Sequence, residues 1–307
     1  MTGFRSVSSV DGRICVTSEA AVPVLDRGFL YGDSIYEVFR TYGGVPVLYD
    51  EHWARFENSA ALIRMRLQLT QDQVGEAIRA AVRASGAPDV PCDVYVRYIV
   101  TRGEGEITLL PATTLTQRLV VIVTALPAWK PSFYEQGVVL SVVGTRRNDA
   151  HALDPNIKGG NYLNNVLGII EAKQRGADDC LMLDGSDRIT ESSTSNVFFV
   201  RDGELTTPAQ SSANLKGLTK ETIRQLCDRE GLVCRDEELT TAAAAVADEC
   251  FITSATREVM PVRSLWFEDG SRREYPVGGG SVTRRIAAQY RAFIDGYVRA
   301  HARYSMY

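Results

Sequence analysis

The chain has 307 residues, of which 45% are hydrophobic and 23% charged, so it is long enough to bury a large core in each of two domains. Its formal net charge is −4 and its pI is near 5.6, so there is no overall basic field for binding nucleic acid. Six scattered cysteines without CxxC spacing predict a cytoplasmic protein with reduced thiols, and a membrane span or secretory signal is not expected from the apolar pattern.

The first third of the chain predicts a small α/β domain. SIYEVFRTY and VPVLYD, separated by Gly43-Gly44, predict a β-hairpin. Apolar spacing predicts helices over 51–65 and 71–83 and paired strands over 94–102 and 119–126. Two prolines in LPAWKPS indicate a break in the fold. We therefore predict a small α/β domain over 1–125, a linker over 126–135 and a larger barrel-like domain over 136–307, which together make an α+β protein.

The second half of the chain predicts further strands and helices. A strand is expected over 137–144 and another at ECFIT, with turns at Asp184-Gly185 and Asp202-Gly203. Helices are predicted over 219–230 and 282–302. A further helix carries Leu163, Val166, Leu167 and Ile170 at the spacing of one buried face.

Several common chemistries lack their usual residues. The chain has three histidines and no HExxH pattern, so we predict no metal site. It has neither a P-loop nor a GxGxxG segment after a strand, so the usual phosphate cradle of nucleotide enzymes is absent from the sequence. Gly32-Asp33-Ser34 resembles the nucleophile block of one class of serine esterases, but no histidine follows an acid at the required place, and Ser34 is predicted to be a strand residue.

Lys158 is the most distinctive residue of the chain. There are five lysines against 29 arginines, and this one lies in NIKGGNYLNN, between Pro155 and two glycines. A desolvated lysine is a nucleophile toward carbonyl groups, and a tight bend would hold its stem away from the surface. The alternative is an ordinary loop lysine beside a helix that Asn161 caps.

Three other segments carry candidate binding groups. Glu191 precedes a run of small hydroxyl and amide residues in ITESSTSNVFFV. Gly217-Leu218-Thr219 begins a predicted helix, where backbone N–H groups either bind an anion or are capped by Thr219. Arg55 lies early in a helix and is either a phosphate clamp or an exposed charge. Pyridoxal 5′-phosphate requires a lysine, an acid for its pyridine nitrogen and a cationic phosphate cup, and the chain has one of each.

These segments resemble the class IV aminotransferases, the fold-type IV pyridoxal phosphate enzymes. The resemblance extends from about Val24 to Arg291 and is carried by six blocks in order: DRGFLYGDSIYEVFRTYGG, EHWARFENSA, NIKGGNYLNN, ITESSTSNVF, LKGLTKETI and FITSATREVMPV. It implies a small α/β domain and a larger pseudo-barrel domain. It also implies a homodimer in which the neighbouring subunit's loop, here 103–111, closes the substrate pocket.

The resemblance also implies roles for individual residues. Lys158 would be the catalytic lysine and the link to the cofactor, and Glu191 would pair with the pyridine nitrogen. The remaining cofactor-binding residues would be Arg55, Tyr162, Leu215, Leu218, Thr219 and Ala255. Ala255 departs from the family pattern, because many relatives have a threonine there, and Thr256 or Ser254 would compensate for the missing hydroxyl.

The substrate pattern is mixed. Tyr95 and Arg97 match positions near the substrate carboxylate in branched-chain enzymes, whereas Arg102 resembles the carboxylate-binding region of D-amino-acid enzymes. Tyr36 fits either, and Thr256 is a further candidate. We expect a hydrophobic or branched-chain L-amino acid as donor and 2-oxoglutarate as acceptor. A D-amino-acid or (R)-amine transaminase is the alternative, followed by aminodeoxychorismate lyase and by a binding protein without turnover.

Overall fold

The computed structural model describes residues 3–90 and 92–307, and the chain divides into two compact units. Unit 1 comprises Met1–Pro127, Ile157–Asn161 and Ile294–Tyr307, and unit 2 comprises Ala128–Asn156 and Tyr162–Phe293. The first break, after Pro127, lies in the predicted linker. The sequence predicted that each domain is one continuous stretch of chain. The segments Ile157–Asn161 and Ile294–Tyr307 depart from this, because they are short and their spatial neighbours lie far away in the chain.

Unit 1 contains a six-stranded antiparallel sheet in the order β2-β1-β6-β5-β3-β4. The strands are β1 Val7–Val10, β2 Arg13–Val16, β3 Ser34–Tyr42, β4 Val45–Pro46, β5 Val94–Thr101 and β6 Arg118–Ala125. The predicted hairpin is confirmed, since Tyr42 pairs with Val45 and both Gly43 and Gly44 have positive φ. The predicted pairing of the two later strands is also confirmed, because Val94–Thr101 lies antiparallel to Arg118–Ala125.

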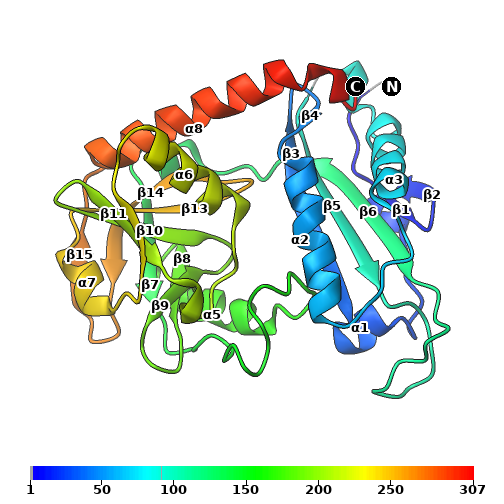
Figure 1. The fold of residues 1–307 in the computed structure, drawn as a ribbon, viewed down its shortest axis with the longest axis horizontal. Helices are drawn as coiled ribbons and strands as arrows, with labels where there is room; N and C mark the ends of the chain where they lie inside the picture. Colours follow the sequence, from blue (N-terminus) through cyan, green and yellow to red (C-terminus); the bar gives the residue numbers. More distant parts are fainter. Residues whose placement is uncertain (1–2, 91) are drawn as a thin grey trace. The chain divides into compact units, whose positions relative to one another are not determined.

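Two long helices pack on one face of this sheet (Figure 1). The helices of unit 1 are α1 Arg27–Tyr31, α2 Tyr49–Leu62 and α3 Gln71–Ala84, with short 3-10 turns at Thr17–Glu19, Ala87–Asp89 and Ala302–Tyr304. Thr70 begins α3 with a capping box, in which its hydroxyl accepts from the N–H of Gln73 and its own N–H donates to the Gln73 side chain. Phe56 of α2 and Ile78 of α3 are fully buried against the sheet together with Tyr98.

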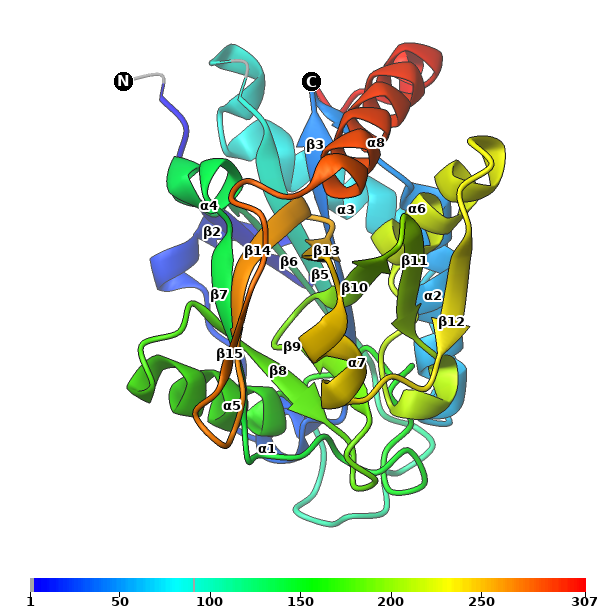
Figure 2. The same cartoon turned by 90° about the vertical axis from the view of Figure 1, so that its left-hand side faces the viewer.

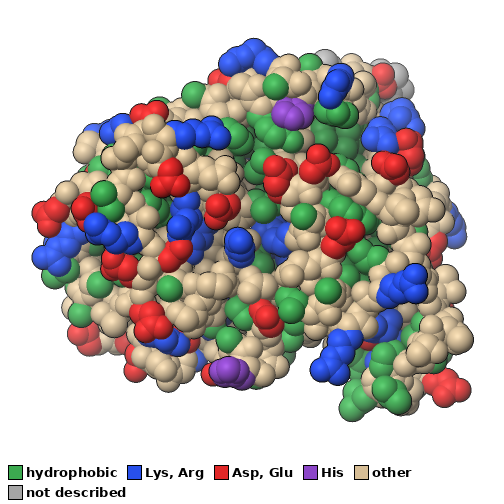
Figure 3. Space-filling view, in the orientation of Figure 1, with side chains coloured by type: hydrophobic (Ala, Val, Ile, Leu, Met, Phe, Trp, Pro, Cys, Tyr) green, Lys and Arg blue, Asp and Glu red, His purple; other side chains and the backbone are tan. Residues whose placement is uncertain are grey.

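The loop between β5 and β6 carries large apolar side chains at its tip. Ile107, Leu109 and Leu110 are 77%, 81% and 81% exposed. Figure 3 shows hydrophobic side chains on the surface of this loop. Arg27 holds the base of the tip, because its guanidinium donates to the carbonyl oxygens of Thr108 at 2.5 Å and Leu109 at 2.8 Å.

Unit 2 contains a nine-stranded mixed sheet. Its path is β12-β11-β10-β13-β14-β7-β8-β9, and β15 pairs with β14. The strands are β7 Val138–Val142, β8 Asp179–Leu183, β9 Ile189–Ser192, β10 Asn196–Arg201, β11 Glu204–Pro208, β12 Cys234–Glu237, β13 Glu249–Ser254, β14 Glu258–Trp266 and β15 Arg272–Glu274. The turn at Asp202-Gly203 joins β10 to β11, as its sequence predicts. Parallel pairing is confined to β11 with β12, β14 with β7 and β7 with β8.

The helices of unit 2 flank this sheet. They are α4 Pro131–Glu135, α5 Leu163–Gln174, α6 Leu218–Arg229 and α7 Thr241–Val246, with a 3-10 turn at Gln210–Ser212, while α8 Ser281–Ala300 has residues in both units. Two carboxylate oxygens of Glu249 accept the N–H groups of Val282 and Thr283 and so cap the start of α8. Among the described residues, no helix is both long and apolar enough to cross a membrane.

The predicted buried face of α5 is wrong. Leu163, Val166, Leu167 and Ile170 are 71%, 44%, 50% and 48% exposed. The helix instead packs on β7 and β8 (Figure 2) through small residues, because a Cβ on Gly168 would lie 3.3 Å from the Cys180 sulfur and Ala172 is fully buried. The cap prediction is also wrong, since Tyr162 rather than Asn161 occupies the N-cap position and provides no side-chain cap.

Candidate active site

The backbone of Lys158 is fixed against β3 and α2 of unit 1. Its carbonyl oxygen accepts the N–H of Tyr36 at 2.9 Å, and its N–H donates to the hydroxyl of Ser59 at 3.2 Å. The two glycines that follow permit this approach. A Cβ on Gly159 would lie 3.0 Å from the Ser34 carbonyl oxygen, and one on Gly160 would lie 2.7 Å from the Ser34 hydroxyl. The two glycines after Lys158 are therefore required because this segment lies close against Ser34 at the start of β3.

The side chains of Lys158 and Arg97 both lie against the ring of Tyr36. Its Nζ lies 4.7 Å from the ring centroid of Tyr36, and the Arg97 guanidinium lies 3.7 Å from the same centroid. Tyr95 and Arg97 are alternate residues of β5, so both project from the face of the sheet opposite the helices. Two cations beside one aromatic ring create a positive environment suited to an anionic substrate.

Arg55 belongs to a buried charged cluster with two residues that were not predicted. Its Nε and Nη2 lie 2.6 and 2.7 Å from the two carboxylate oxygens of Glu37, and Nδ1 of His52 lies 2.7 Å from one of them. Glu37 is fully buried on the helix-facing side of β3. The alternative that Arg55 is an exposed surface charge is wrong, because its side chain is 12% exposed and faces Glu37.

Burial and charge act against each other in this cluster. Burial alone would raise the pKa of Glu37, but Arg55 and His52 outweigh it and hold that pKa well below its usual range. Burial lowers the pKa of His52 more than Glu37 raises it. Burial also disfavours the charge on Arg55, but Glu37 outweighs this and raises the pKa of Arg55. The cluster therefore consists of an ion pair and a neutral imidazole at neutral pH.

Arg102 is held by a different carboxylate. Its Nε lies 2.7 Å from Asp33, and its Nη2 donates to the carbonyl oxygen of Ile63 at 2.8 Å. Asp33 also accepts from Nε of Arg27 at 3.0 Å. Arg102 therefore joins β5 to the end of α2 and to the segment after α1, and its charge is already paired.

In unit 2, Glu191 is buried, forms an ion pair and accepts one backbone hydrogen bond. Nη2 of Arg147 lies 2.9 Å from one carboxylate oxygen, and the N–H of Leu215 donates to the other at 3.1 Å. Arg147 also donates to the side-chain oxygen of Asn165 at 2.8 Å, and Asn165 donates to the carbonyl oxygen of Ser193 at 2.8 Å. The carboxylate of Glu191 is thus oriented by a cation and by the backbone of a predicted cofactor-binding residue.

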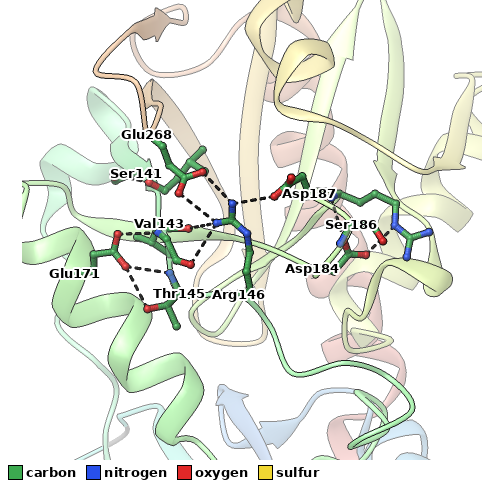
Figure 4. Close-up of polar contacts among 12 residues, drawn as sticks. Ser141, Val143, Thr145, Arg146, Glu171, Asp184, Ser186, Asp187 and Glu268 are labelled. Carbon is green, nitrogen blue, oxygen red and sulfur yellow. Dashed lines mark hydrogen bonds and ion pairs between the residues drawn. The ribbon is translucent and has the colours of Figure 1, made fainter.

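The segment that carries Arg147 is anchored on both sides (Figure 4). Arg146 pairs with Asp187 at 2.8 Å and with Glu268 at 3.1 Å, and it donates to the carbonyl oxygen of Val143 at 2.8 Å. Glu171 of α5 accepts the N–H of Gly144 at 2.7 Å. These contacts restrict the backbone that presents Arg147 to Glu191.

The start of α6 is shaped for an anion. Gly217 is its N-cap residue and gives no side-chain cap, so the first N–H groups of the helix, including those of Leu218 and Thr219, have no partner within the helix. The amide of Asn196 donates to the carbonyl oxygen of Leu215 at 2.9 Å. A Cβ on Gly217 would lie only 1.9 Å from the Asn196 side-chain oxygen, so glycine is required there.

Several hydroxyl groups among the described residues of unit 2 are buried without a partner. Within residues 3–90 and 92–307, the hydroxyls of Ser192, Ser195 and Thr253 are buried and have no hydrogen-bond partner. Thr253 lies near the end of β13, and Ala255 directly follows that strand. The carbonyl oxygen of Thr256 accepts a hydrogen bond from Nε1 of Trp129 at 3.1 Å. Ser254 is engaged as well, because its hydroxyl accepts the N–H of Arg257 at 3.2 Å.

Within unit 2, two features fit a phosphorylated pyridine aldehyde. The uncapped start of α6 provides N–H donors for a phosphate, and Glu191 is a buried carboxylate suited to a protonated ring nitrogen. Within unit 1, Lys158 is an amine of the kind that binds an aldehyde. Tyr162 lies directly before α5 and is half-buried.

Sequence reasoning missed Glu37, His52 and Arg147. Strand alternation places Glu37 on the helix-facing side, and the spacing of His52 and Arg55 on one helix was a usable signal for a carboxylate partner. No comparable signal distinguished Arg147 from Arg146, since the two are adjacent and only one faces Glu191.

Comparison with known proteins agrees with this geometry. The family model "Amino-transferase class IV" matches residues 34–265. A branched-chain-amino-acid aminotransferase of Pseudomonas aeruginosa is 29% identical over 304 residues, covering 95% of this chain and 94% of the relative. A D-alanine aminotransferase of Bacillus licheniformis is 32% identical over 256 residues, covering 83% and 87%. The crystal structure of the branched-chain amino acid aminotransferase of Escherichia coli superposes with a TM-score of 0.86 at 27% identity and covers 96% of both chains.

Proposed function

Because the chain belongs to the class IV aminotransferases, we propose that it transfers the amino group of a hydrophobic or branched-chain L-amino acid to 2-oxoglutarate. The protein is a pyridoxal phosphate enzyme with an α+β, fold-type IV architecture. The observation that carries the substrate proposal is the pair of cations, Lys158 and Arg97, on the ring of Tyr36. It places an amine beside a guanidinium that can bind a carboxylate.

The bound cofactor supplies an electron sink for the bond that is broken at the substrate's α-carbon. Lys158 would provide the amine that holds the cofactor. Its Nζ atom would also accept the substrate's α-proton and later give it back. Because the keto-acid product leaves before the acceptor enters, we expect ping-pong kinetics.

Glu191 and Arg147 maintain the charge that this chemistry requires. Glu191 would hold a proton on the pyridine nitrogen, which makes the ring a stronger electron sink. Arg147, 2.9 Å away, orients this buried carboxylate. In unit 2, the N–H groups of Leu218 and Thr219 would bind the phosphate, with Leu215 packing against the ring. Arg55 of unit 1 is proposed for the same role, and its guanidinium would have to keep or exchange its pairing with Glu37.

We assign the substrate carboxylate to Arg97. Asp33 already neutralises Arg102, so binding a substrate there would require that ion pair to break. Tyr95 lies on the same face of β5 as Arg97 and would orient the same group. Thr256 remains a candidate contact for the substrate.

A D-amino-acid transaminase is the second candidate function. The D-alanine aminotransferase of Bacillus licheniformis, at 32% identity, supports it. An (R)-amine donor would use the same groups of the protein without a carboxylate at Arg97.

The absorbance of the bound cofactor tests both candidates. Purified holoenzyme is mixed separately with L-leucine, D-alanine and (R)-1-phenylethylamine, without acceptor. Loss of the visible cofactor band with L-leucine alone is the expected result, and its recovery with 2-oxoglutarate would establish the acceptor. Loss with D-alanine alone would replace the L-amino-acid proposal with the second candidate.

We also propose a homodimer. The apolar face of α5 and the apolar tip of the 103–111 loop both expose large hydrophobic side chains, and burying such surfaces against a second copy would be favourable. A cytoplasmic location is proposed from the six unpaired cysteines, which suit a reducing compartment.

A further inference from the structure

Two of the six cysteines lie next to each other in unit 2, at the end of α6 opposite Gly217. Cys227 is buried in the last turns of α6, and Cys234 is the half-buried first residue of β12. The chain between them folds back on the helix, because the N–H of Leu232 donates to the carbonyl oxygen of Cys227 at 2.9 Å. Asp236, two residues after Cys234, pairs with Arg224, three residues before Cys227. The start of β12 therefore lies beside the last turns of α6, and the two cysteines face each other across a short loop.

Positive charge surrounds this pair. Lys220 and Arg224 precede Cys227 by seven and three residues, so all three lie on one side of α6. Both cations pair with Asp236 of β12, Lys220 at 3.4 Å and Arg224 more closely. Asp236 is two residues from Cys234, and strand alternation places both side chains on the same side of β12. The thiols thus lie beside a fixed ion-pair cluster.

This environment makes the two thiols unequal. Interaction with the Cys227 thiol lowers the pKa of Cys234, and the charges of Arg224 and Lys220 lower it further. Burial and the charge of Asp228 raise the pKa of Cys234 but do not outweigh these effects. Interaction with the Cys234 thiol, together with burial, raises the pKa of Cys227. Cys234 is consequently the thiol that ionises first, and it is also the more accessible of the two.

We propose that Cys227 and Cys234 form a redox-active dithiol, which a low-molecular-weight disulfide converts to an intrachain disulfide. The Cys234 thiolate attacks one sulfur of the reagent, the reagent's S–S bond breaks, and one thiolate leaves. The Cys227 thiol then loses its proton to solvent and attacks the mixed disulfide, and the second reagent thiolate leaves. The protein loses two electrons and two protons, and one molecule of the disulfide becomes two thiols. Transamination uses neither cysteine, so this site is separate from the proposed reaction.

The other buried cysteines could not start this exchange. Burial raises the pKa of both Cys180 and Cys250, so neither provides the readily ionised thiol that Cys234 provides. Cys15 is half-buried in β2 of unit 1 and provides a matched control for accessibility.

Mass spectrometry of the holoenzyme after incubation with oxidised glutathione tests the proposal. The expected result is a mass lower by two hydrogen atoms, a peptide linking residues 227 and 234, and reversal by dithiothreitol. Cys227→Ala should instead retain one glutathione on Cys234, and Cys234→Ala should show neither product. Cys15→Ala should behave as the wild type.

Two outcomes would overturn the proposal. One is a wild-type protein that accumulates a stable glutathione adduct without the linked peptide. The other is a disulfide that still forms in Cys227→Ala. Cys227→Ser keeps the side-chain size and replaces Cys227→Ala if the latter does not fold, with the same expected adduct on Cys234.

Discussion

Nη2 of Arg147 lies 2.9 Å from the carboxylate of Glu191, and the two side chains are 13% and 8% exposed. Glu191 is therefore presented together with a cation that was not apparent from the sequence. We predict that Arg147→Ala lowers kcat more than it raises KM. Loss of a polar contact of this kind to a charged group costs about 2 kcal/mol, which corresponds to roughly 30-fold in rate. Steady-state kinetics test this, and Arg147→Lys should restore part of the activity. Wild-type kcat in Arg147→Ala would contradict the role.

Lys158→Ala should abolish transamination and leave the fold intact. The backbone of residue 158, rather than its side chain, makes the hydrogen bonds to Tyr36 and Ser59, so these remain in the variant. The measurements are the cofactor half-reaction with L-leucine and the thermal midpoint. Lys173→Ala is the matched control, because Lys173 is an exposed lysine of α5. Turnover in Lys158→Ala would remove the catalytic assignment.

His52 should make the fold sensitive to mild acid. Its pKa is lowered in the folded protein by burial, so below the ordinary value of 6.5 the unfolded chain binds a proton that the folded chain excludes. Stability is therefore fully present above pH 6.5 and declines as the pH falls below it. His52→Asn keeps a donor for Glu37, and its urea midpoint should fall less than that of the wild type between pH 7.5 and about 5.5.

The exposed His151 gives the control for this measurement. His151→Asn should retain the pH dependence of the wild type. If His52→Asn and the wild type lose stability in parallel over the same pH range, His52 is not the responsible group. Glu37 does not cause a loss of stability in this range. Its pKa is held well below the ordinary value of 4.5 in the folded protein, so its stabilising contribution is fully present above pH 4.5 and is lost only as the pH falls below that value.

Gly217→Ala should weaken cofactor binding. The new Cβ would lie 1.9 Å from the Asn196 side-chain oxygen, so the start of α6 or Asn196 must shift. Overpacking of this kind costs about 1–3 kcal/mol, or roughly 5- to 150-fold in Kd. Titration of the apoenzyme with pyridoxal phosphate measures it. Gly185→Ala should bind normally, because a Cβ there would meet nothing within 4 Å. Equal Kd values for the two variants would exclude the phosphate role of this turn.

Leu167→Glu should convert the proposed dimer to a monomer. Leu167 is 50% exposed in the centre of the apolar face of α5, and a charge buried there would be unpaired. Analytical ultracentrifugation of the variant measures the change. Val246→Glu is the control, since Val246 is 48% exposed on a different helix, α7. A monomeric wild-type protein would contradict the dimer itself.

Local patterns in the sequence predicted most elements of the fold. The β3–β4 hairpin, α2, α3 and α6 follow from turn chemistry and apolar spacing. The orientation of α5 did not, because its large apolar residues satisfy helical periodicity whether they face the sheet or the surface. Gly168 and Ala172 decide the orientation, since only small residues allow α5 to approach Cys180 and Met182.

Site residues of a rare type could be picked out from the sequence, whereas the many arginines could not be told apart. Lys158 stood out because the chain has only five lysines. Arg97 and Arg102 could not be separated, because their difference is the presence of Asp33 beside one of them, 69 residues away in the chain. Pairing at that separation is a property of the folded sheet and leaves no local pattern.

Unit 1 is completed by two segments from later in the chain, Ile157–Asn161 and Ile294–Tyr307. Gly159 pairs with Ile35, and the N–H of Met306 donates to the carbonyl oxygen of Gly44 at 2.9 Å. During synthesis the N-terminal strands therefore emerge before the ribosome has made the residues that finish their unit. Neither unit can therefore be obtained by a single cut in the gene. Recombination that exchanged the chain after Pro127 as one block would replace Lys158 while keeping the sheet that holds its backbone.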